Sequence, residues 1–203
     1  VLDAAARVAQ REHIEGDDRA VLLFAALCHD LAKATTTVLR NKGGVMRWTA
    51  WGHEEEGAPL AKALLGRMGI KHSISVEVEP LVANHLITSH LREISARAIR
   101  RLAMRLAPAN IQKLTWLIEA DHSGRPPLPG GLPDGARKIF EMAQQQAVAE
   151  QPQAPWILGR HVLPYFDGRP GKHIGEVVRA ASEAQADGEF SNEPDALVWL
   201  ERY

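Results

Sequence analysis

The sequence is short of the residues that mark secreted and membrane proteins. It has one cysteine, Cys28, in 203 residues, which excludes an internal disulfide and favours a reducing compartment. No run approaches the roughly 20 consecutive apolar residues of a membrane-spanning helix, and no signal peptide is visible. We therefore expect a cytoplasmic protein without a membrane partner.

An excess of charge of one sign is also missing. The chain has 24 Lys and Arg residues against 25 Asp and Glu residues, for a net charge of -1. This balance excludes a polycation that binds nucleic acid through bulk charge, so any such contact would need a local basic patch. Only 5% of the residues are aromatic, and no aromatic-rich platform for single-stranded nucleic acid is evident.

Strand patterns are absent as well, whereas helical spacing of apolar residues recurs along the chain. Hydrophobic residues make up 45% of the sequence, enough for a sizeable core. The spacing predicts an all-α fold, with a long loop at residues 34–52 that contains Gly43 and Gly44. The predicted helices cover residues 1–11, 17–33, 53–68, 75–88, 95–106, 109–123, 133–150, 173–186 and 193–201.

Two proline-rich segments divide the chain. Arg125 to Pro133 reads RPPLPGGLP, and Gln151 to Pro155 reads QPQAP. They predict a helical domain over residues 1–124, a linker with one helix over 125–158 and a small helical tail over 159–203. The chain also begins inside a helical pattern without an initiator methionine, so we expect it to be a piece of a longer protein.

An adjacent histidine and aspartate follow the most apolar segment of the sequence. Residues 20–27 are almost free of polar groups, and His29 and Asp30 come next, in the stretch LCHDLAK. Burying an imidazole and a carboxylate is costly unless they are paired with each other or bound to a cation. The pair therefore predicts a functional site at the end of this helix.

Three further side chains interrupt apolar helices in the same way: His53, His85 and Asp121. Imidazole and carboxylate groups are ligands that suit a divalent metal. Such a metal lowers the pKa of a bound water and prepares it to attack a phosphate. For His85, the alternative is a hydrogen-bonded histidine of the core.

The stretch LCHDLAK resembles the signature of the HD superfamily of metal-dependent phosphohydrolases. That family combines an early histidine, a His-Asp pair and a distant aspartate on a helical bundle around a metal. The resemblance maps the pair to His29 and Asp30 and the last aspartate to Asp121. It implies that these three bind a first divalent metal, whose identity stays open among Ni, Mn, Mg, Fe and Co.

The same resemblance suggests roles for neighbouring residues. His53 and His85 would bind a second metal or contact the substrate phosphate. Asp30 would bridge two ions and orient the attacking water, and Lys33 would offset charge that develops on the phosphate. The alternative for Lys33 is an exposed lysine favoured by the helix dipole.

The early histidine of the family pattern has no clear equivalent in this sequence. The one histidine upstream of His29 is His13, which is expected in an exposed turn. We therefore expect the missing ligand to precede Val1, and we expect a chain without it to hold metal weakly.

Longer stretches narrow the resemblance to bacterial tRNA nucleotidyltransferases, the CCA-adding enzymes related to poly(A) polymerases. LCHDLAKATT, WGHEEEGAPLAKALLGRMGI and EADHSGR are similar to their HD domain, and residues 159–190 are similar to their C-terminal segment. The resemblance implies a fragment that follows the nucleotidyltransferase head, with tRNA or a small phosphoester as its partner. Its local chemistry would be hydrolysis of phosphomonoesters or 2′,3′-cyclic phosphodiesters. Nucleotide addition is not expected here, because no strand with paired aspartates is visible.

Basic residues at helical spacing, and others in a loop before a helix, are candidate contacts for phosphate or RNA. They are Arg97, Arg100, Arg101, Arg105, Arg169 and Lys172. The alternative for the four helical arginines is a solvated face paired with nearby acids. The alternative for the loop is an ordinary Pro-Gly turn that caps a helix.

Two other functions stay open at this point. One is a non-catalytic, helical tRNA-binding body with a degenerate metal site. The other is a free-standing nucleotide hydrolase with no link to tRNA. The sequence also leaves the oligomeric state open, with a homodimer as one candidate.

Overall fold

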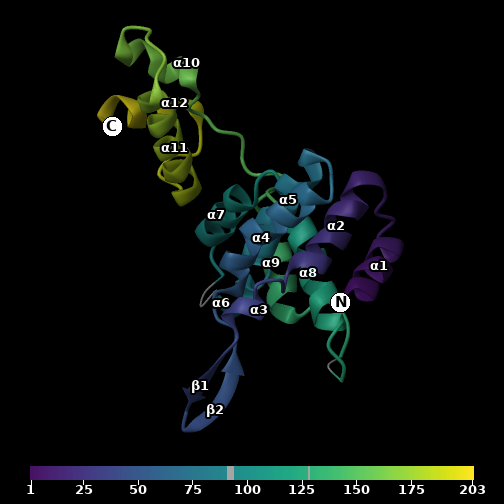
Figure 1. Ribbon diagram of the computed structural model, residues 1–203. Helices are drawn as coiled ribbons and strands as arrows, with labels where there is room; N and C mark the ends of the chain where they lie inside the picture. The colour runs from purple at the N-terminus through teal and green to yellow at the C-terminus, as the bar shows by residue number, and fades with distance from the viewer. Residues whose placement is uncertain (91–93, 128) are drawn as a thin grey trace.

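The computed structural model describes residues 1–90, 94–127 and 129–203, and there it confirms the all-α fold class apart from one small hairpin (Figure 1). The helices are α1 (Leu2–Arg11), α2 (Gly16–Cys28), α3 (Lys33–Thr36), α4 (His53–Arg67), α5 (His72–Asn84), α6 (Ile87–His90), α7 (Ala96–Leu106), α8 (Ile111–Ser123), α9 (Asp134–Gln145), α10 (Gly159–Val162), α11 (Lys172–Asp187) and α12 (Glu193–Arg202), with a short 3-10 helix η1 (Leu163–Phe166). The hairpin consists of β1 (Val38–Lys42) and β2 (Val45–Thr49). No helix among the described residues is long and apolar enough to cross a membrane.

Helix α8 is the central element of the larger core. It packs against α1, α2, α5, α7 and α9. Its residues Leu114, Leu117 and Ala120 are completely buried. Because α8 is held from several sides, the side chains in its last turn have well-defined positions, and Asp121 is one of them.

Polar side chains define the starts of three helices that the sequence predicted. Ser95 accepts a hydrogen bond from the backbone of Ala98 at the start of α7. Asn110 caps α8 in the same way, and Asn192 caps α12. These side chains satisfy N–H groups that have no partner inside the helix, which explains why the helices begin where they do.

The prediction of one continuous helix over residues 17–33 was wrong after Cys28. Helix α2 ends at Cys28, and a turn separates it from the short helix α3, which begins at Lys33. The apolar residues Leu31 and Ala32 continue the helical spacing, so the sequence pattern hides the break. The turn matters because it carries both His29 and Asp30.

The prediction of a loop over residues 34–52 was also wrong, because part of it forms the hairpin. Val38 pairs with Thr49 and Lys42 with Val45 in an antiparallel register. The connection is Gly43-Gly44, with φ of 64° and 85°. Positive φ at both positions is what a two-residue hairpin turn of type I′ requires, and glycine adopts it without strain. Both strands are exposed, so neither shows the alternation that marks a half-buried strand.

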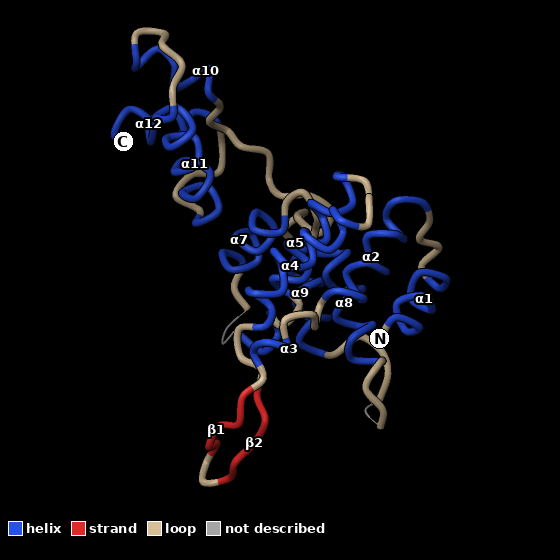
Figure 2. The backbone as a smooth tube through the Cα atoms, viewed as in Figure 1, coloured by secondary structure: helices blue, strands red, loops and turns tan. Residues whose placement is uncertain are grey.

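The C-terminal residues have a hydrophobic core of their own. Ile157, Val162, Ala181, Phe190 and Leu200 are among the residues buried in it. Figure 2 shows this unit beyond a loop connection that leaves the larger bundle. Helix α9 does not belong to it, because its buried residues lie in the larger core.

One short segment of α11 joins the two units. Gln185 accepts a hydrogen bond from the backbone of Trp156 at 3.0 Å and donates one to the carbonyl of Ala154 at 2.9 Å. Two residues on, the carboxylate of Asp187 pairs with Arg97 and Arg101 of α7. Residues 185–187 therefore connect the C-terminal unit both to the connecting loop and to the larger bundle.

Replacing Asp187 with asparagine is expected to loosen this junction. Arg97 and Arg101 would lose their shared carboxylate, and exposed ion pairs contribute little each, so we expect a modest effect. Limited proteolysis in the connection at residues 151–155 should become about two- to fivefold faster. Glu183→Gln, which removes a charge one helical turn away, is the control. Equal cleavage rates for Asp187→Asn and the control would contradict this role.

Candidate metal centre

Five polar side chains that are distant in sequence meet at one end of the larger bundle. His29 and Asp30 lie in the turn after α2, His53 is the first residue of α4, His85 directly follows α5, and Asp121 lies in the last turn of α8. The three imidazoles and Asp121 are buried. All five residues thus lie at or next to a helix end, where the backbone leaves the apolar core.

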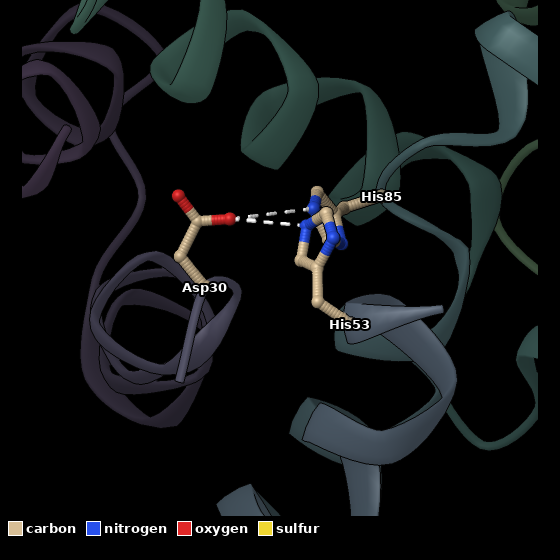
Figure 3. Close-up of side chains that lie close together, drawn as sticks. All are labelled: Asp30, His53 and His85. Atoms are coloured by element: carbon tan, nitrogen blue, oxygen red, sulfur yellow. Dashed lines mark ion pairs between the residues drawn. The ribbon is translucent and has the colours of Figure 1, made fainter. Parts of the chain in front are cut away.

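The carboxylate of Asp30 stands between the three imidazoles. Its Oδ1 lies 3.2 Å from Nε2 of His53 and 3.9 Å from Nε2 of His85. Figure 3 shows this oxygen pointing toward both rings. Its Oδ2 lies 3.2 Å from Nε2 of His29. The same nitrogen of His29 lies 3.3 Å from Oδ1 of Asp121. Asp30 therefore faces two separate groups of donor atoms, one with each oxygen.

All three imidazoles are oriented by the same backbone contact. The Nδ1 atom of each lies within hydrogen-bond distance of the carbonyl three residues earlier, at 2.9 Å for His29, 2.6 Å for His53 and 2.7 Å for His85. A carbonyl requires Nδ1 to carry the proton, which leaves Nε2 to face the carboxylates. Backbone orientation of this kind is typical of histidines that bind metals.

The donor atoms fit a divalent cation. Nε2 of His29 and of His53 is buried, and although each lies near a carboxylate, neither makes a well-aligned hydrogen bond within the described residues. Ligand atoms of Asp30, His53 and His85 all lie within 4.8 Å of one another. Imidazole nitrogens and carboxylate oxygens are a donor set that divalent transition metals take, so these residues could hold one.

The pKa values of the site reflect its mixture of burial and charge. Burial works against a charged His29, but the carboxylates of Asp121 and Asp30 prevail and raise its pKa to about 9. Burial also works against charge on Asp30, yet its ion pairs with His29 and Lys33 hold the pKa of the carboxyl well below its usual range. Burial lowers the pKa of His85 to about 4, so this imidazole is neutral at pH 7.

Two cationic side chains border the carboxylates. Nζ of Lys33 lies 2.7 Å from Oδ2 of Asp30, and the Arg125 guanidinium lies 2.5 Å from Oδ2 of Asp121. Lys33 was predicted from the sequence, whereas Arg125 was missed. Arg125 lies just beyond the end of α8, and its closeness in sequence to Asp121 was the available signal.

The predicted basic residues lie elsewhere. Arg97 and Arg101 pair with Asp187, and Arg100 donates to the carbonyl of Ala186. Arg105 donates to Asn84. Arg169 and Lys172 are exposed and lie just before and at the start of α11, which belongs to the C-terminal unit. Contacts of these six basic residues with phosphate stay predictions. For Arg97 and Arg101, the structure shows the alternative, a pairing with an acidic residue.

Comparison with protein families agrees with this geometry. A family model for the HD domain matches residues 1–119. The chain belongs to the HD domain family. The resemblance drawn from LCHDLAK is therefore confirmed, and the five clustered side chains lie in, or directly after, the matched part of this HD domain.

Curated relatives extend the similarity to most of the chain. The HD-domain chain is 27% identical to the A-adding tRNA nucleotidyltransferase of Deinococcus radiodurans, over 90% of its own length and 42% of the relative. It is 27% identical to the CC-adding tRNA nucleotidyltransferase of Thermus thermophilus, over 87% of its length and 38% of the relative. It is 31% identical to the Multifunctional CCA protein of Xanthomonas campestris pv. campestris, over 92% of its own length and 42% of the relative. The chain thus spans about two fifths of the length of these relatives. Comparison with solved structures gave no match.

Proposed function

We propose that this chain is the HD-domain part of a tRNA nucleotidyltransferase-type protein, and that its polar cluster is a metal-dependent phosphohydrolase site. The substrate classes are ribonucleoside 2′,3′-cyclic phosphates and phosphomonoesters. The observation that carries the proposal is the convergence of three backbone-oriented imidazoles on the carboxylate of Asp30.

The two oxygens of Asp30 suggest which residues would hold a first metal and which would hold a second metal or contact the phosphate. His29 and Asp121 lie on the Oδ2 side of Asp30 and would hold a first divalent metal with it. His53 and His85 lie on the Oδ1 side and would hold a second metal or contact the substrate phosphate. A bound divalent metal would supply an acidified water and positive charge for the phosphate.

The chain's own residues would then guide the hydrolysis. Water adds to the phosphorus of a cyclic phosphate, one ring P–O bond breaks, and the released ribose oxygen takes up a proton. Asp30 is placed to accept a hydrogen bond from the attacking water and so to orient it. Lys33, which contacts Asp30 at the exposed side of the cluster, is placed to offset negative charge on the phosphate oxygens.

We extend the proposal to tRNA as the macromolecular partner of the whole protein. It is supported by similarity over about 90% of the chain to proteins named for tRNA nucleotide addition. Nucleotide addition itself is not proposed for these residues. The sheet found in the described part of the chain is the hairpin of residues 38–49, which contains no carboxylate that could serve such a reaction.

A combined assay of metal content and turnover tests the hydrolase proposal. The purified chain, loaded with Ni²⁺, Mn²⁺ or Mg²⁺, should hydrolyse 2′,3′-cyclic AMP or p-nitrophenyl phosphate. Removal of the metal by a chelator should lower turnover at least about 100-fold, because the nucleophile and the charge on the phosphate depend on it. His72→Ala, which removes an exposed histidine at the start of α5, should leave turnover unchanged.

The competing interpretation is a helical tRNA-binding body that does no chemistry. It predicts no turnover with any metal, and tRNA affinity that falls with salt but is unaffected by replacing Asp30. Because the chain spans about two fifths of the length of these relatives, an absence of turnover should be checked again on a longer chain that extends beyond Val1. If the extended chain also shows no turnover with any metal, the hydrolase proposal is wrong.

A further inference from the structure

The segment that carries the hairpin has an unusual charge. Residues 31–52 contain no aspartate or glutamate, although the whole chain has a net charge of -1. The same segment contains Lys33, Arg40, Lys42 and Arg47. It is therefore a local concentration of positive charge, and it directly joins Asp30 to His53.

The register of the hairpin separates its side chains into two faces. Residues directly opposite each other point to the same side, so Arg40 and Arg47 share one face with Lys42. Leu39 and Trp48 share the other face with Met46. Both strands are exposed, and Figures 1 and 2 show the hairpin projecting from the bundle on the side away from the C-terminal unit.

A cavity connects the base of the hairpin to the metal centre. It has a volume of about 520 Å³, and its lining includes Trp48, Trp51, Lys33 and His53. Trp48 is 72% exposed and Trp51 is 63% exposed, an unusual state for the largest apolar side chains. The guanidinium of Arg40 lies 5.0 Å from the ring centre of Trp51, within the range of a cation–π contact.

We propose that the hairpin and this cavity bind a single-stranded RNA end. The bases would stack on Trp48 and Trp51, and the backbone would cross the edge of the hairpin so that its phosphates meet Arg40 and Arg47 on the face opposite to Trp48. The terminal phosphoester would reach the metal centre beside His53. The proposal rests on the proposed hydrolase function for that last step, and it names the substrate class of the same site.

The chemistry of the surface favours RNA over an apolar protein partner. Exposed aromatic rings combined with cations are how proteins hold single strands without reading their sequence. Complementarity to a phosphate backbone also explains why the whole segment between Asp30 and His53 carries cations and no acid. A duplex fits less well, because stacking on the indoles requires bases that are not already stacked.

Binding of a short, fluorescein-labelled RNA that ends in a 2′,3′-cyclic phosphate tests the proposal by fluorescence anisotropy. With a chelator present, the measured affinity does not depend on hydrolysis. Trp48→Ala should weaken binding about 5- to 150-fold, the usual effect of removing one stacking ring. Trp48→Phe, which keeps a ring, should retain most of the affinity. A duplex of the same sequence should bind more weakly than the single strand.

The cations have a separate signature. Arg40→Gln combined with Arg47→Gln should weaken binding and lower the salt dependence, reducing the slope of log K against log salt by about 1.4, or about 0.7 for each phosphate that is no longer neutralised. Arg137→Gln with Lys138→Gln removes two exposed cations of α9, and Tyr203→Ala removes an exposed ring of the C-terminal unit. Both controls should bind RNA like the unmodified chain.

The outcomes separate this proposal from the hydrolase proposal. If the chain hydrolyses p-nitrophenyl phosphate but Trp48→Ala and the double arginine variant bind RNA normally, the RNA-binding hairpin is wrong and the hydrolase stands. If no hydrolysis occurs but these variants bind RNA weakly, the hairpin stands and the hydrolase fails. Equal losses in the variants and in the controls would also overturn the proposal.

Discussion

Replacing Asp30 with asparagine is expected to lower divalent-metal affinity at least about 100-fold, because the loss of even an outer partner of a metal ligand costs about 10- to 100-fold. Asp30 is the one carboxylate that faces His29, His53 and His85 together within the described residues. An amide has a single oxygen and no charge, so it cannot serve both groups of donors. Hydrolysis should be lost along with the metal.

Titration calorimetry with Mn²⁺ or Ni²⁺ on chelator-treated protein measures this effect. The fold should survive Asp30→Asn, because the N–H₂ group of the new amide can donate to an unprotonated Nε2 and satisfy it. Glu56→Gln is the matched control, since it removes a carboxylate from the exposed side of α4, three residues after His53. Metal affinity in Asp30→Asn equal to that of Glu56→Gln would contradict the assignment of Asp30 to the metal centre.

Replacing Leu117 with alanine is expected to lower the free energy of unfolding by about 2–5 kcal/mol. Leu117 has no exposed surface and lies in the middle of α8, the helix that the rest of the larger core surrounds. The truncation removes buried apolar area and leaves a cavity that the neighbouring helices cannot close completely. Urea unfolding followed by circular dichroism measures the change.

The surface supplies the control for this prediction. Leu60 of α4 is 46% exposed, and Leu60→Ala should change the free energy of unfolding by less than about 1 kcal/mol. Leu117 lies one helical turn before Asp121, but its side chain has no donor atom to offer the metal centre. At low temperature, folded Leu117→Ala should therefore bind metal with unchanged stoichiometry. Equal stability losses in the two leucine variants would show that α8 is not the centre of the core.

Much of the site could be predicted from the sequence because burial makes polar residues conspicuous. A histidine or carboxylate at the end of an apolar helix has a high cost unless it has a partner. That argument alone selected His29, Asp30, His53, His85 and Asp121, the five side chains that the structure brings together. Local spacing also predicted most of the helices, since each buries one face over several turns.

The hairpin could have been predicted from the sequence, but it was missed. Gly43-Gly44 is a two-residue turn signal between residues that favour strands. The expected alternation of apolar and polar residues is absent because both faces of the hairpin are exposed. As a result, the sequence pattern indicates only that Trp48 and Trp51 are aromatic residues of a loop. The folded hairpin shows that they line one cavity with His53.

By itself, the sequence determined the all-α class, the positions of most helices and the identity of the clustered polar residues, because these depend on local periodicity and on the cost of burying charge. Tertiary structure alone decided the end of α2 at Cys28, which frees both His29 and Asp30 to face the cluster. It also decided the pairing of Arg97 and Arg101 with Asp187, which lies 90 and 86 residues further along the chain. Pairings between residues so far apart depend on how the helices pack, and no spacing within a single helix records them.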